Sequence, residues 1–311
     1  MQPASLRRAI LWMLIAAFLT LAYWTATPEI NHGVGYLVHA AALERWGAAP
    51  FSWRVLVPFT INLFVPLTDI VGVLWAIAFL SIFLTAAALI ALFAWLRLWV
   101  NEARAWIGVA IGALLVPLMY ASYVNSANLP LEVILILIVL LMRDRRNWRY
   151  AAPIALAALN RETGVYLVIL YALLPDMQAR WLLRDLLVFL LTFALVNAAF
   201  PATWYWGGAF DFLDEPAYLL TALVYQTPFL CLFALALRNR KAALPDLRRL
   251  WWFVPINYAA FLLFGRWAEV RLLFPALAVT MPLIVLPRRP PIRAASACQA
   301  ASAETLSPSG E

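Results

Sequence analysis

Residues 150–174 read YAAPIALAALNRETGVYLVILYALL, an apolar stretch interrupted in its middle by the polar segment NRETG at 160–164. Neither apolar half is long enough to cross a bilayer, because a spanning helix takes about 20 residues. The two halves, 150–160 and 164–174, therefore predict two short helices that form a hairpin. Arg161 is expected near the tip of this hairpin.

The composition of the whole chain sets the environment in which such a hairpin exists. Of the 311 residues, 65% are hydrophobic and 13% are charged, and the mean hydropathy is +0.84. An ordinary soluble domain is about 45–50% apolar and about 25% charged. The chain contains two cysteines, too few for a disulfide framework. The composition predicts an all-α, polytopic transmembrane helix bundle, and excludes a soluble enzyme, a nucleic-acid binder and a secreted disulfide scaffold.

Eight further apolar runs are candidate membrane spans. Together with the two helices of the hairpin they predict about ten membrane helices within residues 1–287. The eight runs are 9–26, 69–98, 104–121, 129–142, 184–200, 218–237, 250–265 and 271–287.

The distribution of Lys and Arg predicts the orientation of these spans. With a cytosolic N-terminus and a hairpin that enters and leaves on the same side, eighteen of the 23 basic residues fall on the cytosolic side. A single crossing at 150–174 would instead place the basic residues of 238–249 outside. We therefore predict a multi-pass protein of the cytoplasmic membrane, with both termini cytosolic and an active face on the periplasmic or extracellular side.

The segments between the spans divide into outer loops and a tail. Residues 27–68 form the predicted first outer loop, with interfacial helices anchored by tryptophans. Residues 200–217 form an aromatic and acidic outer loop, and 265–271 form a short outer turn. The Ala-, Ser- and Pro-rich tail at 288–311 is predicted to be disordered and cytosolic.

The tip of the hairpin is the first candidate site. A guanidinium at Arg161, near helix N-terminal amides, suits a phosphate group. The alternative is that Arg161 and Glu162 neutralise each other or a neighbouring helix. Asn160 and Thr163 are expected to cap the two half-helices, and Gly164 to permit the turn.

Further ionisable residues lie at or near the outer ends of spans. Glu132 lies one turn into its span, where a carboxylate is not expected to face lipid. It is either a ligand for substrate or a metal, or the partner of Arg161 or Arg271. Glu269 and Arg271 immediately precede the last span. They either reach an outward-facing polar cavity between the spans or form a surface ion pair.

The beginning of the first outer loop holds the candidate general bases. Glu29 can take a proton from a hydroxyl, and His32 can do so near neutral pH. Tyr36 and Arg54 belong to the same outward-facing polar region. The alternative for this segment is a solvated loop with an ordinary exposed acid.

The second outer loop contains aromatic side chains followed by carboxylates, in the segment WYWGGAFDFLDE at 204–215. Trp204 and Trp206 offer faces on which a sugar can stack, while carboxylates accept hydrogen bonds from its hydroxyls. The alternative is an aromatic belt at the membrane interface.

Three short motifs carry a resemblance to a known class of proteins. They are PFSWRVLVP at 50–58, NRET at 160–163 and EVRLLFP at 269–275. With the long outer loop after the first span, they resemble the GT-C class of polytopic glycosyltransferases, which use a sugar linked to polyprenyl phosphate at the outer face of the membrane. The likeness extends over most of residues 1–287.

This resemblance implies roles for individual residues. Glu29 would be the base that activates the acceptor hydroxyl, and Arg161 with Arg271 would hold the donor phosphate as it leaves. Tyr36, Arg54, Glu132, Glu162, Trp204, Trp206 and Glu269 would line the substrate site. The chain departs from the class at HGVGY, residues 32–36, where His32 stands in place of an expected aspartate.

The function expected from these observations is transfer of a hexosyl or pentosyl group from a polyprenyl-phosphate donor to a glycan, lipid or protein acceptor. Membrane lipids are expected partners and nucleic acid is not. The sequence requires no cofactor and leaves a divalent metal open. The alternatives are a transporter or flippase for a lipid-linked or anionic substrate, and a non-catalytic subunit of cell-envelope assembly. A transporter should carry polar residues along a path to both faces.

Overall fold

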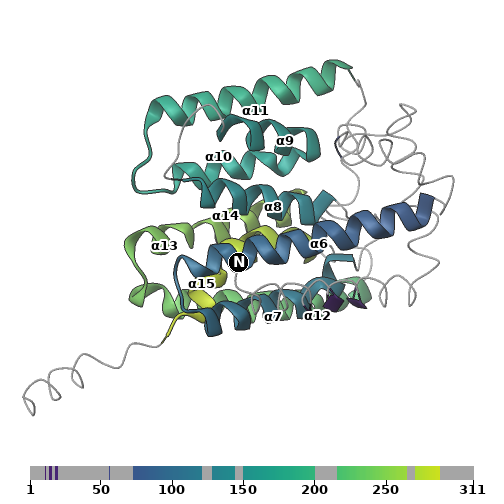
Figure 1. Ribbon diagram of the computed structural model, residues 1–311, viewed down its shortest axis with the longest axis vertical. Coiled ribbons are helices and arrows are strands. Elements are labelled where there is room, and N and C mark those ends of the chain that lie inside the picture. The colour runs from purple at the N-terminus through teal and green to yellow at the C-terminus, as the bar shows by residue number, and fades with distance from the viewer. Residues whose placement is uncertain are drawn as a thin grey trace, which may run out of the picture.

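The computed structural model describes residues 73–120, 128–143, 150–199, 216–264 and 270–287, with a few isolated positions before residue 57. Every regular element in these ranges is helical, which confirms the predicted all-α class. Figure 1 shows these helices side by side in one bundle. In chain order they are α6 Val73–Arg97, α7 Glu102–Tyr120, α8 Asn128–Leu141, α9 Ala151–Asn160, η3 Glu162–Gly164, α10 Val165–Ala172, α11 Ala179–Ala199, α12 Pro216–Asn239, η5 Arg240–Ala242, α13 Pro245–Leu250, α14 Phe253–Phe264, η6 Val270–Leu273 and α15 Phe274–Val285.

Three helices in the described part are long and apolar enough to cross a membrane. They are Phe79–Arg97, Ala179–Ala199 and Ala222–Ala242. Leucines are exposed along the second and third of these segments, for example Leu191, which is 63% exposed, and Leu223, which is 48% exposed. Exposed leucines of this kind suit a lipid surrounding. The chain is therefore a membrane protein, while the total of about ten membrane helices stays a prediction.

Several predicted segments lie outside the described residues. These are the first outer loop at 27–68, the aromatic loop apart from its last two residues, and the tail at 288–311. The first predicted span, 9–26, is described only at isolated positions.

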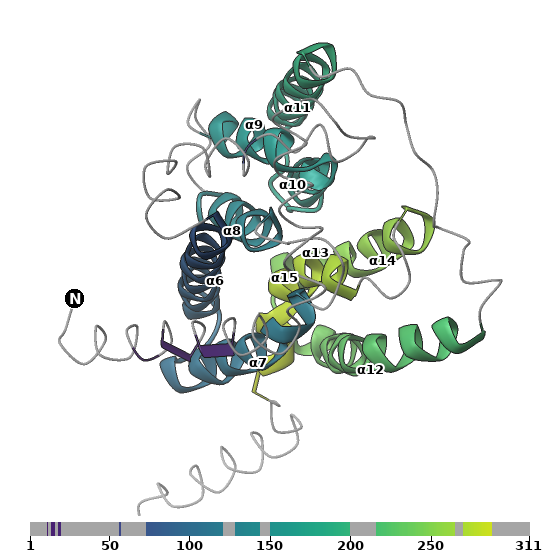
Figure 2. The ribbon, with the colours of Figure 1, turned by 90° about the vertical axis from the view of Figure 1, so that its right-hand side faces the viewer.

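The predicted hairpin is present as two short helices, α9 and α10, separated by η3. Both views place α9 and α10 next to each other between α8 and α11 (Figures 1 and 2). Gly164 lies against the last turns of α9, where a Cβ atom would approach the Ala157 carbonyl carbon to 2.6 Å. Gly164 has ordinary helical angles, with φ −53° and ψ −21°. The turn therefore needs glycine for its missing side chain and not for its backbone freedom.

The expected side-chain caps of the hairpin are not formed. Neither η3 nor α10 has a capping hydrogen bond from a side chain. The turn is closed by backbone bonds instead, from the Arg161 amide to the Ala157 carbonyl at 2.9 Å and from the Gly164 amide to the Arg161 carbonyl at 2.9 Å. The prediction that Asn160 and Thr163 act as caps was wrong, because backbone carbonyls already accept the bonds that close this turn.

Helix α15 lies at the centre of the bundle, and all of its residues are buried. It contacts α7, α8, α12, α13 and α14, which surround it in Figure 2. Its last carbonyls accept hydrogen bonds from other helices: the Asn239 side-chain amide donates to Leu283 at 2.9 Å and Arg104 donates to Val285 at 3.0 Å. Helix ends leave carbonyls without intrahelical partners, so these two side chains satisfy a buried terminus.

Helices α6 and α7 pack closely because two glycines of α7 face α6. A Cβ atom on Gly108 would lie 2.7 Å from a methyl carbon of Leu96, and one on Gly112 would lie 3.1 Å from a methyl carbon of Leu92. Small residues four positions apart allow membrane helices to approach each other in this way.

One end of the bundle carries arginines stacked on tryptophans. The Arg143 guanidinium lies 4.7 Å from the Trp99 ring, that of Arg184 lies 4.5 Å from the Trp181 ring, and that of Arg240 lies 4.8 Å from the Trp252 ring. These residues lie just after α6, α8 and α12, at the beginning of α11 and just before α14, on the left in Figure 1. We call this the arginine–tryptophan end. Such pairs are typical of the level of lipid headgroups.

Candidate functional site

A buried ion pair joins the hairpin to α8. The Nη1 atom of Arg161 lies 3.3 Å from the Glu132 carboxylate, and the two side chains are 5% and 2% exposed. Glu132 lies in the first turns of α8, and Arg161 is the extended residue between α9 and η3, with φ −160° and ψ 155°. Helix α8 packs against α9. The packing of α8 against α9 thus places the Arg161 cation and the Glu132 anion side by side in the interior.

Glu162 forms the accessible edge of this centre. Its carboxylate lies 3.9 Å from Nη2 of Arg161, and its side chain is 28% exposed. The Glu132 side of the guanidinium is therefore enclosed, whereas the Glu162 side reaches the surface of the protein. Glu162 is therefore the most exposed side chain of this centre.

The ion pair supplies Glu132 with one of the partners that the sequence offered for it. The sequence left it as a ligand for substrate or metal, or as the partner of a cation, and the structure supplies that partner in Arg161. An isolated charge in an apolar interior costs several kcal/mol, so each member of the pair makes the burial of the other tolerable. Glu132, Arg161 and Glu162 are the predicted site residues that the structure brings together.

A second set of polar side chains extends from this centre across the bundle. Tyr166 of α10 lies close enough to Glu132 and Arg161 to interact with their charges. It also lies beside the side chain of Asn257 in α14. The next residue, Tyr258, donates a hydrogen bond of 2.7 Å to the Oε1 atom of Gln226 in α12. Asn257 and Gln226 are fully buried.

Sequence reasoning missed this polar set. Asn257 and Gln226 are single amides inside apolar helices, and an uncharged amide does not stand out from a hydropathy profile. The signal that was available is their position: both interrupt otherwise apolar helical runs, where an amide needs a buried partner.

Arg271 is buried at the other predicted phosphate-binding position. It is 4% exposed and lies in η6, immediately before α15. The η6 turn contacts α7, α12 and α14. This arginine therefore lies inside the protein and not on its surface.

The remaining predicted site residues fall outside the part of the chain that the structure describes. They are Glu29, His32, Tyr36, Arg54, Trp204, Trp206 and Glu269. Their roles stay predictions. Within the described ranges, no group of three or more His, Cys, Asp and Glu side chains is placed to hold a metal ion.

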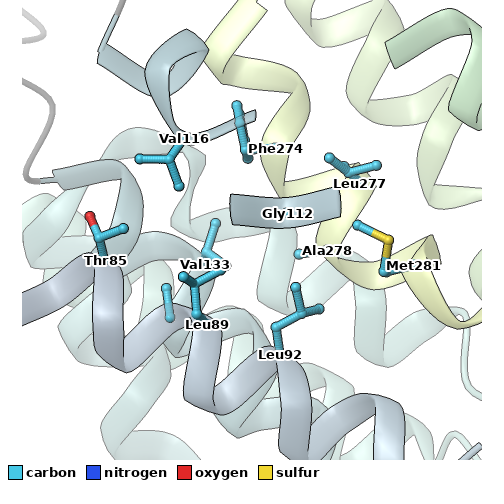
Figure 3. A pocket seen from close by; sticks show the side chains of 11 residues that line it. Thr85, Leu89, Leu92, Gly112, Val116, Val133, Phe274, Leu277, Ala278 and Met281 are labelled. Carbon is cyan, nitrogen blue, oxygen red and sulfur yellow. The ribbon is translucent and has the colours of Figure 1, made fainter. Parts of the chain in front are cut away.

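A small apolar cavity lies beside the centre, between α6, α7, α8 and α15 (Figure 3). Its volume is about 30 Å³, and its walls include Val133, the residue after Glu132, and Phe274, at the beginning of α15. Thr85 is the polar residue in its wall. Apolar cavities of this kind stay free of water, so this one suits an apolar group and not a charged one.

A second buried carboxylate lies at the arginine–tryptophan end. Asp185 of α11 is fully buried and accepts hydrogen bonds from Arg184 at 2.8 Å and 2.6 Å. The Arg184 guanidinium also lies 5.9 Å from the ring of Tyr150, beside the beginning of α9. This pair lies within one helix and provides a matched control for the pair between Arg161 and Glu132.

Comparison with protein-family models, with curated proteins and with solved structures finds no match.

Proposed function

We propose that this chain is an integral membrane glycosyltransferase, which moves a sugar from a polyprenyl-phosphate-linked donor to an acceptor at the outer face of the cytoplasmic membrane. The observation that carries the proposal is the buried pair of Arg161 and Glu132 with its accessible edge at Glu162. This centre lies at the tip of the hairpin, on the opposite side of the bundle from the arginine–tryptophan end in Figure 1.

The chemistry of such a transfer needs positive charge where the phosphate leaves. When the bond between sugar and phosphate breaks, negative charge develops on the departing phosphate, and a cation already in position stabilises it. A guanidinium offers several donors in a fixed plane that matches phosphate oxygens. Glu132 fixes the orientation of the Arg161 guanidinium through its contact at 3.3 Å.

The charge balance of the centre requires a second cation for a phosphate. Arg161 stands against two carboxylates, those of Glu132 and Glu162. A phosphate would add further negative charge, and like charges at short range repel. In our proposal Arg271, which is also buried, supplies the second positive charge.

The acceptor needs a base, and Glu132 is not placed for that role. Its carboxylate is engaged by Arg161 and is 2% exposed, so it orients the guanidinium. The base in our proposal is therefore Glu29 or His32 of the first outer loop, as the resemblance to the GT-C class implies.

A transporter or flippase is the second candidate, and one observation favours it. The polar set of Tyr166, Asn257, Tyr258 and Gln226 continues from the charged centre into the bundle. Polar side chains inside a membrane bundle are typical of a substrate pathway. In a glycosyltransferase the same groups would hydrogen-bond sugar hydroxyls.

One experiment separates the two functions. The purified protein is reconstituted in proteoliposomes with a panel of polyprenyl-phosphate sugars, and both released polyprenyl phosphate and movement of the intact donor between leaflets are measured. A glycosyltransferase releases polyprenyl phosphate when an acceptor is present, and Arg161→Lys abolishes that release. A flippase moves the donor between leaflets and leaves it intact.

The control variant is Arg184→Lys, which alters the other buried ion pair. If Arg184→Lys reduces release as much as Arg161→Lys while both proteins stay folded, then the effect comes from perturbing an arginine–carboxylate pair in general. That result would remove Arg161 from the proposed site.

A further inference from the structure

A second and larger cavity lies at the arginine–tryptophan end, remote from the charged centre. Its volume is about 420 Å³, within the range of about 300–1,000 Å³ in which ligand pockets fall. Trp99, Asn101 and Arg104 line it from the connection of α6 to α7. Leu244 lines it from the residue before α13, and Leu286 and Pro287 line it from the residues after α15.

The main charged donor of this cavity is the guanidinium of Arg104. The Arg104 guanidinium makes one hydrogen bond among the described residues, from Nη1 to the Val285 carbonyl at 3.0 Å. A guanidinium carries five N–H groups, so donors remain for a ligand. The Nε1 atom of Trp99 is buried and does not face the cavity. An anionic acceptor would therefore accept hydrogen bonds from the Arg104 guanidinium.

The charges around the cavity favour an anion. None of its lining residues is acidic. Glu102 follows Asn101, but it is exposed and its carboxylate accepts a hydrogen bond of 3.3 Å from the Trp106 indole. Another acidic residue close in sequence to the lining is Asp246, in the first turn of α13. The cations at this end of the bundle outnumber these two carboxylates. These cations are Arg97, Arg143, Arg240, Lys241, Arg248 and Arg249.

The position of the cavity favours a lipid over a soluble anion. The apolar span Phe79–Arg97 ends two residues before Trp99, so the cavity lies at the level where a bilayer meets water. The remaining wall is apolar, with Leu244, Leu286 and Pro287. A phospholipid carries a phosphate next to apolar chains, and both parts match this lining.

We propose that this cavity binds the headgroup of an anionic phospholipid, with Arg104 donating to the phosphate and the apolar wall contacting the first carbons of the acyl chains. Basic pockets between membrane helices bind anionic headgroups by this combination of charge and apolar contact. The site is separate from the charged centre at Arg161, and this inference does not depend on the proposed transferase.

The test is a lipid titration of the full-length protein in detergent, followed by native mass spectrometry. Phosphatidylglycerol and phosphatidylcholine are compared at equal chain length. We expect the protein to bind phosphatidylglycerol more tightly, and Arg104→Gln to weaken that binding about tenfold, which is the loss expected for a charge-assisted hydrogen bond. Arg97→Gln, an exposed arginine at the same end, should leave it unchanged.

A second variant guards against a folding defect in Arg104→Gln, since Arg104 also caps α15. Leu244→Trp keeps the arginine and fills the cavity, and Leu244 is 58% exposed, so the larger side chain is tolerated at the surface. It should also weaken binding of phosphatidylglycerol. Circular dichroism and gel filtration establish that each variant is folded.

Three results would overturn the proposal. The first is equal affinity for phosphatidylglycerol and phosphatidylcholine. The second is an equal loss in Arg97→Gln and Arg104→Gln, which would indicate general surface charge. The third is full competition by inorganic phosphate together with unchanged binding in Leu244→Trp, which would indicate a site for a free anion.

Discussion

Glu132 and Arg161 are 29 positions apart in the sequence, and their side chains lie 3.3 Å apart in the interior of the bundle. The contact joins the first turns of α8 to the break between α9 and η3. It therefore fixes the tip of the hairpin against the rest of the protein. The pair serves the fold and the proposed chemistry at once, and the two contributions can be separated by experiment.

The first prediction concerns the stability of this ion pair. Glu132→Gln should destabilise the folded protein by about 3–5 kcal/mol, because it leaves the Arg161 charge buried without its partner. The double variant Glu132→Gln with Arg161→Gln should cost less than the sum of the two single variants. Denaturation in mixed detergent micelles measures each free energy of unfolding. Additive losses would show that the two side chains are not energetically coupled.

The second prediction concerns the turn of the hairpin. Gly164→Ala should destabilise the protein by about 1–3 kcal/mol, the usual range for overpacking, because its Cβ would lie 2.6 Å from the backbone of Ala157. Gly112→Ala is the matched control, since its Cβ would meet a flexible leucine methyl at 3.1 Å. The melting temperature of each variant should fall clearly for Gly164→Ala and little for Gly112→Ala. The reverse order would contradict the close approach seen here.

The third prediction concerns the end of the central helix. Asn239→Leu should cost about 1–3 kcal/mol, because it leaves buried carbonyls of α15 without a hydrogen-bond donor. Asn197→Leu serves as the control, because Asn197 donates to Phe193 within its own helix at 3.0 Å and is half-buried. Thermal unfolding in detergent provides the comparison. Equal losses in the two variants would indicate that capping of α15 is not the cause.

The fourth prediction concerns the side of the membrane that the hairpin faces. In a background with Cys231 and Cys298 replaced by serine, Glu162→Cys, at a side chain that is 28% exposed at the tip of the hairpin, should react with an impermeant maleimide added outside the cell. Met177→Cys, on the exposed turn between α10 and α11, should react only after the membrane is opened. Reaction of both cysteines from the same side would contradict the predicted orientation of the hairpin.

The positions of the described helices could be predicted from the sequence because membrane helices appear in it as long apolar runs. The predicted runs 104–121 and 129–142 match α7 and α8 to within two residues at each end. The predicted hairpin also has its two helices at the expected places. The caps were mispredicted because the choice between a side-chain bond and a backbone bond depends on the exact path of a turn.

The candidate site was predictable in its members and not in its connections. Arg161 and Glu132 stand out as charges within apolar sequence, and the sequence offered their pairing as one alternative among several. Which cation pairs with which anion depends on how α8 and α9 are rotated about their own axes. A hydropathy profile contains little information about that rotation. The same limit explains why the neighbourhood of Tyr166 and Asn257 was not foreseen.

The central place of α15 has a consequence for how the protein is made. This helix follows every other described helix in the chain, yet it fills the middle of the bundle that they form. During synthesis the surrounding helices are made first. The side chains of Asn239 and Arg104, which donate hydrogen bonds to carbonyls of α15, are therefore present before α15 itself. The interior of the bundle is therefore completed only when α15 inserts between the described helices that precede it in the chain.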